Sequence, residues 1–120
     1  MSARLKKKKY LKVWGSGKPL RELIFVDDIA DACVFFMNKK TKCSLINIGS
    51  GKDMSIKEYA KFLIKKLDLK VKIKFDKSKP DGVPKKLLDI SLAKKFGWKS
   101  KISLEKGFEI TYKSFLKNYK

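Results

Sequence analysis

Residues 13–28 read V-W-G-S-G-K-P-L-R-E-L-I-F-V-D-D, and the interpretation of the whole chain depends on this stretch. Gly15-Ser16-Gly17 follows an apolar run, as the glycines of a phosphate-binding loop do. A dinucleotide-binding G-x-G-x-x-G loop, however, has a third glycine and leads directly into a helix whose N-terminus receives the pyrophosphate. Here Leu20 stands at the third glycine position, Pro19 precedes it, and strand-like residues follow. The sequence therefore predicts a turn between strands, which leaves the flanking tryptophan and arginine unexplained.

Hydrophobic periodicity and turn signals in the rest of the chain predict an α/β protein with at least one parallel crossover. A Ser-x-x-Glu capping box at 55–58 marks the start of one helix, because each of its side chains binds a backbone N–H of the first turn. V-K-I-K-F-D at 71–76 alternates with a period of two, as a half-buried strand does. The expected elements are, in order, strands at 11–14 and 22–27, a helix at 28–38, a strand at 44–48, a helix from residue 56, a strand at 71–76, a helix at 91–96 and a closing helix capped by Ser103.

The helix predicted at 28–38 is apolar on nearly every side. Asp28 is expected to cap its start, because a carboxylate there accepts hydrogen bonds from the free N–H groups of the first turn. The interior, I-A-D-A-C-V-F-F-M, is typical of a helix packed between two layers. Cys33 is accordingly predicted to be a small buried residue. The pair Asp27 and Asp28 is interpreted as structural rather than catalytic, because adjacent side chains point in different directions.

The composition limits the classes of protein to which the chain can belong. At 120 residues it is expected to form one domain, and a hydrophobic content of 43% is enough to fold. No apolar run approaches the roughly 20 residues that cross a bilayer, and the N-terminal lysine run is not followed by the apolar segment of a secretory signal. The two cysteines lack metal-ligand spacing, and there is no histidine to join them. We therefore expect no membrane association and a cytoplasmic location.

A formal net charge of +19 makes nucleic acid the first partner to consider, because lysine and arginine neutralise phosphates and release counterions. Of the 31 basic residues, only Arg4 and Arg21 are arginines, whereas recognition of base edges and phosphates favours the planar guanidinium group. Apart from the run at 6–9, the lysines are scattered over predicted helix faces. A solvated lysine-rich surface is therefore favoured over nucleic-acid binding. Against this background Arg21 stands out as a candidate functional residue.

A rigid loop at 79–84, K-P-D-G-V-P, leads into the pair Lys85-Lys86. Taken alone, this pattern predicts a turn followed by two surface lysines. Combined with Arg21, it supplies cations for a diphosphate, while Trp14 offers an aromatic face or an indole N–H. Asp81 offers an acceptor for a sugar hydroxyl or a base edge. Spacing alone leaves both interpretations open, and no histidine is present to act as general base beside a serine nucleophile.

Several longer strings of the sequence, taken in order, match the pattern of one protein family. They are W-G-S-G-K-P-L-R-E at 14–22, V-D-D-I-A-D-A at 26–32, N-I-G-S-G at 47–51, S-K-P-D-G at 78–82 and P-K-K-L-L-D at 84–89. In this order they resemble the C-terminal third of the GDP-L-fucose synthases, a family of the extended short-chain dehydrogenases. The N-x-G-x-G turn is shared with sugar-nucleotide epimerases and reductases in general, whereas the first string and the last two are more particular to the family.

The resemblance carries expectations about fold and site. Members of the family epimerise GDP-4-keto-6-deoxy-mannose and reduce it with NADPH to GDP-L-fucose. The residues that the resemblance places at the GDP-sugar are Trp14, Arg21, Asp81 and Lys86. The implied fold class is α/β: a C-terminal substrate-binding lobe with the last elements of a Rossmann-type sheet, incomplete without an N-terminal half. Residues 1–10 are then a basic lead-in, and residues 11–120 form the GDP-sugar-binding region.

The family's cofactor loop and its catalytic serine, tyrosine and lysine lie upstream of these strings. The resemblance therefore implies NADP(H) as the cofactor of the full-length enzymes and none bound by this chain alone, which we expect to be inactive by itself. The expected partner is a GDP-sugar. A subunit that completes a separately encoded Rossmann half is an alternative, as is a lysine-rich nucleic-acid-binding protein, and the family's homodimer is left open. Without such a half, the helix at 28–38 is expected to expose an apolar patch.

Overall fold

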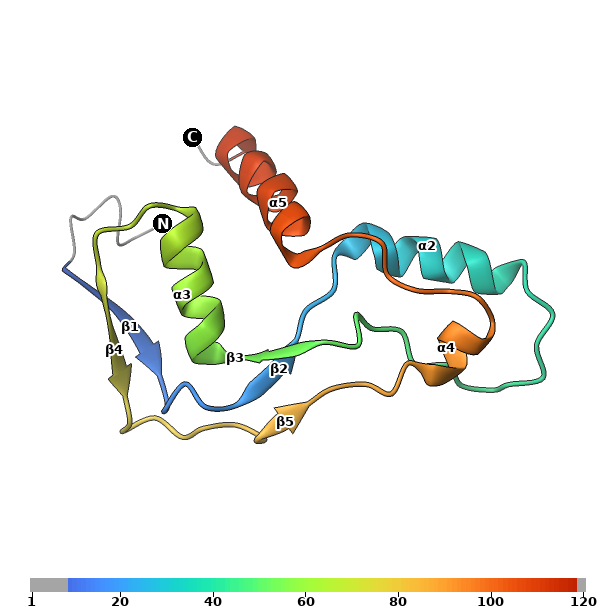
Figure 1. Cartoon of the computed structure of the whole chain (residues 1–120), viewed down its shortest axis with the longest axis horizontal. Coiled ribbons are helices and arrows are strands. Elements are labelled where there is room, and N and C mark those ends of the chain that lie inside the picture. The colour runs from blue at the N-terminus through green and yellow to red at the C-terminus, as the bar shows by residue number, and fades with distance from the viewer. Residues whose placement is uncertain (1–8, 119–120) are drawn as a thin grey trace. The chain divides into compact units, whose positions relative to one another are not determined.

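The computed structural model of the chain describes residues 9–118 and has the α/β architecture that the sequence predicts (Figure 1). Its elements are β1 (Tyr10–Trp14), β2 (Leu20–Glu22), α2 (Val26–Met37), β3 (Asp53–Ser55), α3 (Ile56–Lys66), β4 (Lys72–Asp76), β5 (Lys85–Lys86), α4 (Ser91–Lys95) and α5 (Leu104–Asn118). They belong to two compact units, one built from residues 9–21 and 53–86 and the other from residues 22–52 and 87–118. Of the lead-in predicted at 1–10, residues 1–8 lie outside the described residues, and Tyr10 already belongs to β1.

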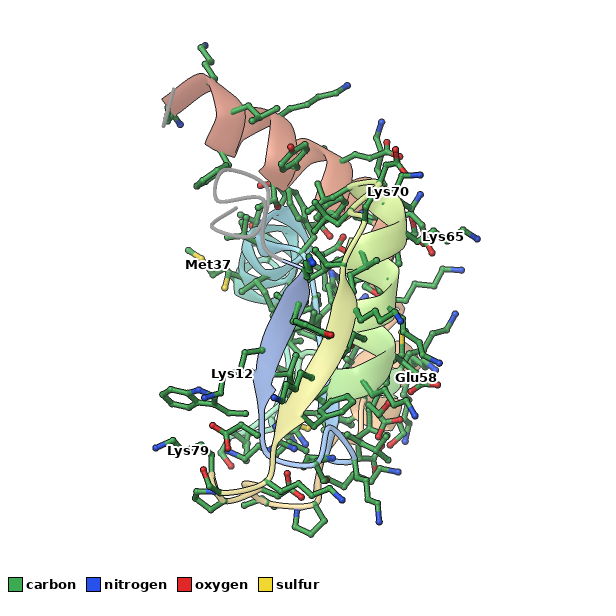
Figure 2. All side chains as sticks on the ribbon, turned by 90° about the vertical axis from the view of Figure 1, so that its left-hand side faces the viewer. Lys12, Met37, Glu58, Lys65, Lys70 and Lys79 are labelled. Carbon is green, nitrogen blue, oxygen red and sulfur yellow. The ribbon has the colours of Figure 1, made fainter. Side chains whose placement is uncertain are left out.

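In the first unit, β1 and β4 form a parallel pair, in register from Tyr10 opposite Lys72 to Trp14 opposite Asp76. Side chains alternate between the two faces of such a pair. The half-buried positions are Leu11, Val13, Ile73 and Phe75, and the exposed lysines are Lys12, Lys72 and Lys74. Figure 1 shows α3 alongside the two strands, and in Figure 2 α3 lies on one side of the pair and Lys12 on the other. The parallel crossover expected from the sequence is confirmed.

A three-stranded group runs in the order β3-β2-β5, with β2 and β5 parallel. The strand predicted at 22–27 is wrong in position, because β2 ends at Glu22 and α2 begins only four residues later. After Glu22 the chain leaves the sheet, and the apolar residue Ile24 packs against the core of the second unit. The strand-like character of these residues was therefore not enough to locate this strand.

The start of α2 also differs from the prediction. The helix begins at Val26, after Phe25, and no side chain caps it. Asp28 lies inside the first turn, where its carboxylate accepts hydrogen bonds from the backbone N–H groups of Lys101 and Ile102, both at 3.0 Å. The side chain is only 2% exposed. The cap predicted at Asp28 is wrong because the carboxylate satisfies a distant loop rather than its own helix, which confirms that Asp28 is structural.

The second unit is organised around Ala32, Ala93 and Trp98, which are all buried. Small residues on α2 and α4 let the two helices approach the indole ring. Asp31 lies in the middle of the apolar helix and has partners there: one of its oxygens accepts from Trp98 Nε1 at 2.9 Å, and both oxygens accept from Lys101 Nζ. The charge of Asp31 is therefore satisfied by the segment that follows α4.

Two predictions for the second unit are wrong. Residues 44–48 do not form a strand, because a strand needs a neighbour for its backbone groups and the described residues provide none at this place. Ile46 and Ile48 pack against the core instead. Cys33 is exposed rather than buried, because the buried stripe of α2 consists of Asp28 and Ala32 and Cys33 lies beside it.

An exposed apolar patch on α2 was expected and is confirmed. Met37 is 84% exposed and Val34 60% exposed, and Figure 2 shows Met37 projecting outward from its helix. Leu45, on the following segment of the same unit, is also exposed. Within residues 9–118, no helix is long and apolar enough to span a membrane.

Replacement of Asp28 by alanine tests the role of the buried carboxylate. We expect Asp28→Ala to lower the free energy of unfolding by about 2–3 kcal/mol, because two partly buried backbone N–H groups lose a charged acceptor. The fluorescence of the buried Trp98 during urea denaturation measures this. Asp27→Ala is the control, since that neighbour is exposed and its loss should cost less than about 1 kcal/mol. Equal effects of the two substitutions would contradict the assignment.

Candidate functional site

The turn between β1 and β2 is formed by two glycines with left-handed backbone. Gly15 and Gly17 both have φ of +77°, a conformation that side-chain-bearing residues avoid. Both are also buried, and a Cβ atom would collide with Asp81 at the first position and with the Phe75 ring at the second. The turn predicted from the sequence is thus confirmed, and close approach as well as backbone angle requires glycine there.

The turn is held from one side by the beginning of α3. The N–H groups of Ile56 and Lys57 donate to the carbonyl oxygens of Pro19 at 3.0 Å and Gly17 at 2.9 Å. Ser55 caps the same helix through the predicted capping box with Glu58. The first-turn donors of α3 are therefore occupied by the protein, and this helix start is not a phosphate site.

From the other side, the turn is bound to the loop at 79–86. Asp81 accepts from Ser16 through both carboxylate oxygens: the backbone N–H donates to Oδ1 at 2.7 Å and the hydroxyl donates to Oδ2 at 2.5 Å. These hydrogen bonds to the ionised form lower the pKa of Asp81 below its ordinary value. The loop is thus fastened to the turn by a charged acceptor.

Arg21 lies on β2 opposite Lys86 on β5, so the parallel pairing places these two cationic residues beside each other. Nη1 of Arg21 donates to the carbonyl oxygens of Leu20 and Val83, each at 2.7 Å. The arginine therefore uses one corner of its guanidinium group to hold the loop. No hydrogen bond from its Nε or Nη2 to another residue of the described chain is present, and Nη2 lies next to Gly82.

Trp14 ends β1 with its side chain 71% exposed. Lys79 places its ammonium group 5.6 Å from the centre of the indole ring, within the range of a cation–π contact. Figure 2 shows Lys79 on the loop below the β1–β4 pair. One face of the indole thus carries a cation from the same loop that contains Asp81.

The structure therefore brings the four residues predicted from the sequence into one unit, around the 14–21 turn and the 79–86 loop. Sequence analysis missed Ser16 as the partner of Asp81, and it missed Lys79 over the indole. A sequence signal for Ser16 is its position between two glycines, which exposes a hydroxyl on a tight turn. The residues described contain no cluster of histidine, cysteine or acidic side chains able to hold a metal ion.

Comparison with known proteins gives the same class of protein. Residues 1–49 match the NAD dependent epimerase/dehydratase family. The chain is 44% identical over 106 residues to GDP-L-fucose synthase 1 of Arabidopsis thaliana, covering 88% of this chain and 33% of that protein. It is also 44% identical over 115 residues to the GDP-L-fucose synthase of Escherichia coli strain K12, covering 88% of this chain and 36% of that protein.

A solved structure supports the same conclusion. A GDP-mannoheptose C4 reductase from Campylobacter jejuni with NADP bound has a TM-score of 0.78 and 34% identity to this chain, over 90% of this chain and 35% of that one. The chain is thus homologous to sugar-nucleotide enzymes of the epimerase/dehydratase type. More narrowly, it is a homologue of the GDP-L-fucose synthases and spans about a third of the length of the curated relatives that it matches, which confirms the resemblance drawn from the motifs.

Alanine at Gly15 tests the close approach between the turn and Asp81. Gly97 also has positive φ, at +92°, but has no atom near its missing Cβ. The left-handed backbone should cost either alanine variant about 1–2 kcal/mol of unfolding free energy. We expect Gly15→Ala to cost more than Gly97→Ala, because Asp81 must also be displaced. Urea denaturation followed by circular dichroism measures both, and equal losses would show that Asp81 yields without cost.

Proposed function

We propose that this chain forms the nucleotide-sugar-binding part of an enzyme of the GDP-L-fucose synthase type. The observation that carries the proposal is the register of β2 and β5, which sets Arg21 beside Lys86. Two cations on neighbouring strands match the two phosphates of a nucleoside diphosphate. Arginine adds specificity, because its planar group donates in pairs to phosphate oxygens.

The other two predicted residues complete the site. Trp14 offers a large exposed aromatic surface, suited to a base or a sugar ring. Asp81 spends one lone pair of each oxygen on Ser16, and its remaining lone pairs can accept from a hydroxyl or a base edge. In this proposal the diphosphate lies at Arg21 and Lys86, and the organic parts of the ligand lie toward Trp14.

NADP(H) is proposed for the complete enzyme, since a solved relative holds NADP. The residues described here do not fit the cofactor. Gly15–Gly17 leads into β2 and Gly49–Gly51 leads into β3, so neither glycine turn opens a helix as a dinucleotide loop does. We therefore assign substrate binding, and no step of hydride transfer, to residues 9–118.

We further propose that a Rossmann-type part of the enzyme covers the exposed face of α2. Val34 and Met37 expose apolar side chains on this helix, and Leu45 exposes another on the segment after it. Side chains of this kind gather where another protein surface packs. The relatives are about three times as long as this chain, so the remaining part of such an enzyme is the occupant of matching size.

Substitution of Arg21 tests the diphosphate site. We expect Arg21→Ala to weaken GDP binding at least tenfold, and Arg21→Lys to weaken it less, because a charged pair of hydrogen bonds is lost in the first case. Isothermal titration calorimetry with GDP measures the affinities.

Lys65→Ala is the control for this experiment, because Lys65 is an exposed lysine on α3 away from the loop (Figure 2). Its GDP affinity should stay within about twofold of that of the unsubstituted chain. Equal affinity of Arg21→Ala and the unsubstituted chain would refute the role of Arg21. Binding of single-stranded nucleic acid that falls steeply with salt, with no binding of GDP, would support the alternative function.

The α2 surface is tested with a complementary partner. The partner is the part of the E. coli enzyme that this chain does not match, expressed separately. We expect it to co-elute with the chain and to restore NADPH oxidation with GDP-4-keto-6-deoxy-mannose, and we expect Val34→Ser with Met37→Ser to reduce both. Ile110→Ser, at a partly exposed apolar residue of α5, should change neither. Co-elution unaffected by the double substitution would place the contact elsewhere.

A further inference from the structure

Three contacts fasten the 79–86 loop to the turn and the strand that follows it. Ser16 donates twice to Asp81, Arg21 Nη1 donates to the carbonyl oxygen of Val83, and the N–H of Leu20 donates to the carbonyl oxygen of Pro84 at 2.8 Å. The first contact differs from the others because one of its two hydrogen bonds joins two side chains, the Ser16 hydroxyl and the Asp81 carboxylate. It joins positions 65 residues apart in the sequence, and no motif assigns it a function.

We infer that Ser16 is a positioning residue of the nucleotide-sugar site, which acts through Asp81 to hold the 79–86 loop in the place where its side chains and those of the turn meet a ligand. This inference rests on the proposed function for the identity of the ligand. It assigns Ser16 no contact with the ligand.

The geometry of the turn directs the Ser16 hydroxyl. Gly15 and Gly17 are buried, and their positive φ angles turn the chain sharply on both sides of Ser16. The hydroxyl oxygen accepts from the backbone N–H of Lys18 at 3.1 Å, so its one hydrogen is left to donate to Asp81. A hydroxyl that accepts on one side and donates to a carboxylate on the other is fixed in orientation, and such chains of hydrogen bonds strengthen one another.

The position of Asp81 explains why this contact matters to the site. Lys79, two residues before Asp81, supplies the ammonium group over the Trp14 ring. Val83, two residues after it, supplies the carbonyl oxygen that receives Arg21 Nη1. Asp81 is thus the midpoint of a short segment that touches both candidate ligand-binding side chains. Release of Asp81 from Ser16 frees the loop to lose both contacts.

The test must separate positioning by Ser16 from direct binding by Asp81. A double-mutant cycle does so, because two residues that act through each other have non-additive effects. GDP is the probe, and isothermal titration calorimetry on the full 120-residue chain measures its affinity. The variants are Ser16→Ala, Ser16→Thr, Asp81→Asn and the combination of Ser16→Ala with Asp81→Asn.

We expect Ser16→Ala to weaken GDP binding about tenfold and Ser16→Thr, which keeps the hydroxyl, to stay within about twofold of the unsubstituted chain. The combined variant should bind GDP no more weakly than Asp81→Asn alone. Ser78→Ala is the matched control: the Ser78 hydroxyl donates to Asp76 at 2.6 Å, which is the same kind of contact in the same unit but within one short segment. Its GDP affinity should change less than twofold. Multiplied losses in the combined variant, or no loss in Ser16→Ala, would overturn the inference.

A second measurement tests the Ser16–Asp81 contact, on which the inference depends, without reference to GDP. Carbon-13 NMR titration of the Asp81 carboxyl should give a pKa below the ordinary value, because Ser16 donates to the charged form. Ser16→Ala should raise this pKa, and Ser16→Thr should leave it low. An ordinary pKa in the unsubstituted chain would overturn the inference. If the chain binds no GDP while Asp81 titrates as expected, the proposed function fails and the Ser16–Asp81 contact stands.

Discussion

Parallel pairing between residues 20–21 and 85–86 is the constraint on which the candidate site depends. Once the two short strands are paired, Leu20 is bonded to the backbone before Lys85, and Arg21 lies beside Lys86. The backbones of two cationic residues are thus held side by side although their charges repel. The backbone carbonyl oxygens to which Arg21 Nη1 donates offset part of that repulsion, because they place partial negative charge beside the guanidinium group. The register, rather than any attraction between side chains, places the cations.

Residues 13–28 contribute to both units, and in each unit a carboxylate accepts hydrogen bonds from the backbone N–H groups of loops or turns. In the second unit, Glu22 Oε1 accepts from the N–H of Gly51 at 2.5 Å, and Oε2 accepts from the N–H of Leu88 at 3.1 Å. Asp28 does the same for the N–H groups of residues 101 and 102. Loop amides that no strand pairs need such acceptors. The acidic residues after Arg21 therefore hold the scaffold of the second unit.

The sequence predicted those elements whose signals are local. The capping box at Ser55 depends on residues three positions apart, and the alternating strand at 72–76 depends on a period of two; both were found. The strand expected at 44–48 was not found, because an apolar run becomes a strand only beside a neighbour. Cys33 was misplaced because a helix with apolar residues all round does not reveal which side faces its unit. The Ser16–Asp81 contact joins distant residues, and no local pattern reports it.

The partners of the acidic side chains explain why the chain keeps a large net positive charge. Lys12 and Ser78 hold the pKa of Asp76 at about 2, and Ser16 lowers the pKa of Asp81. Such carboxylates stay ionised in mildly acidic solution, but Asp76 pairs with a single lysine, Lys12, and Asp81 is directed at the neutral Ser16, so the two acids offset little of the positive charge. Most lysines therefore attract anions without any fixed geometry. Lys86 differs because a strand fixes its place beside an arginine. This fixed position distinguishes a candidate binding site from a merely charged surface, which the composition alone cannot do.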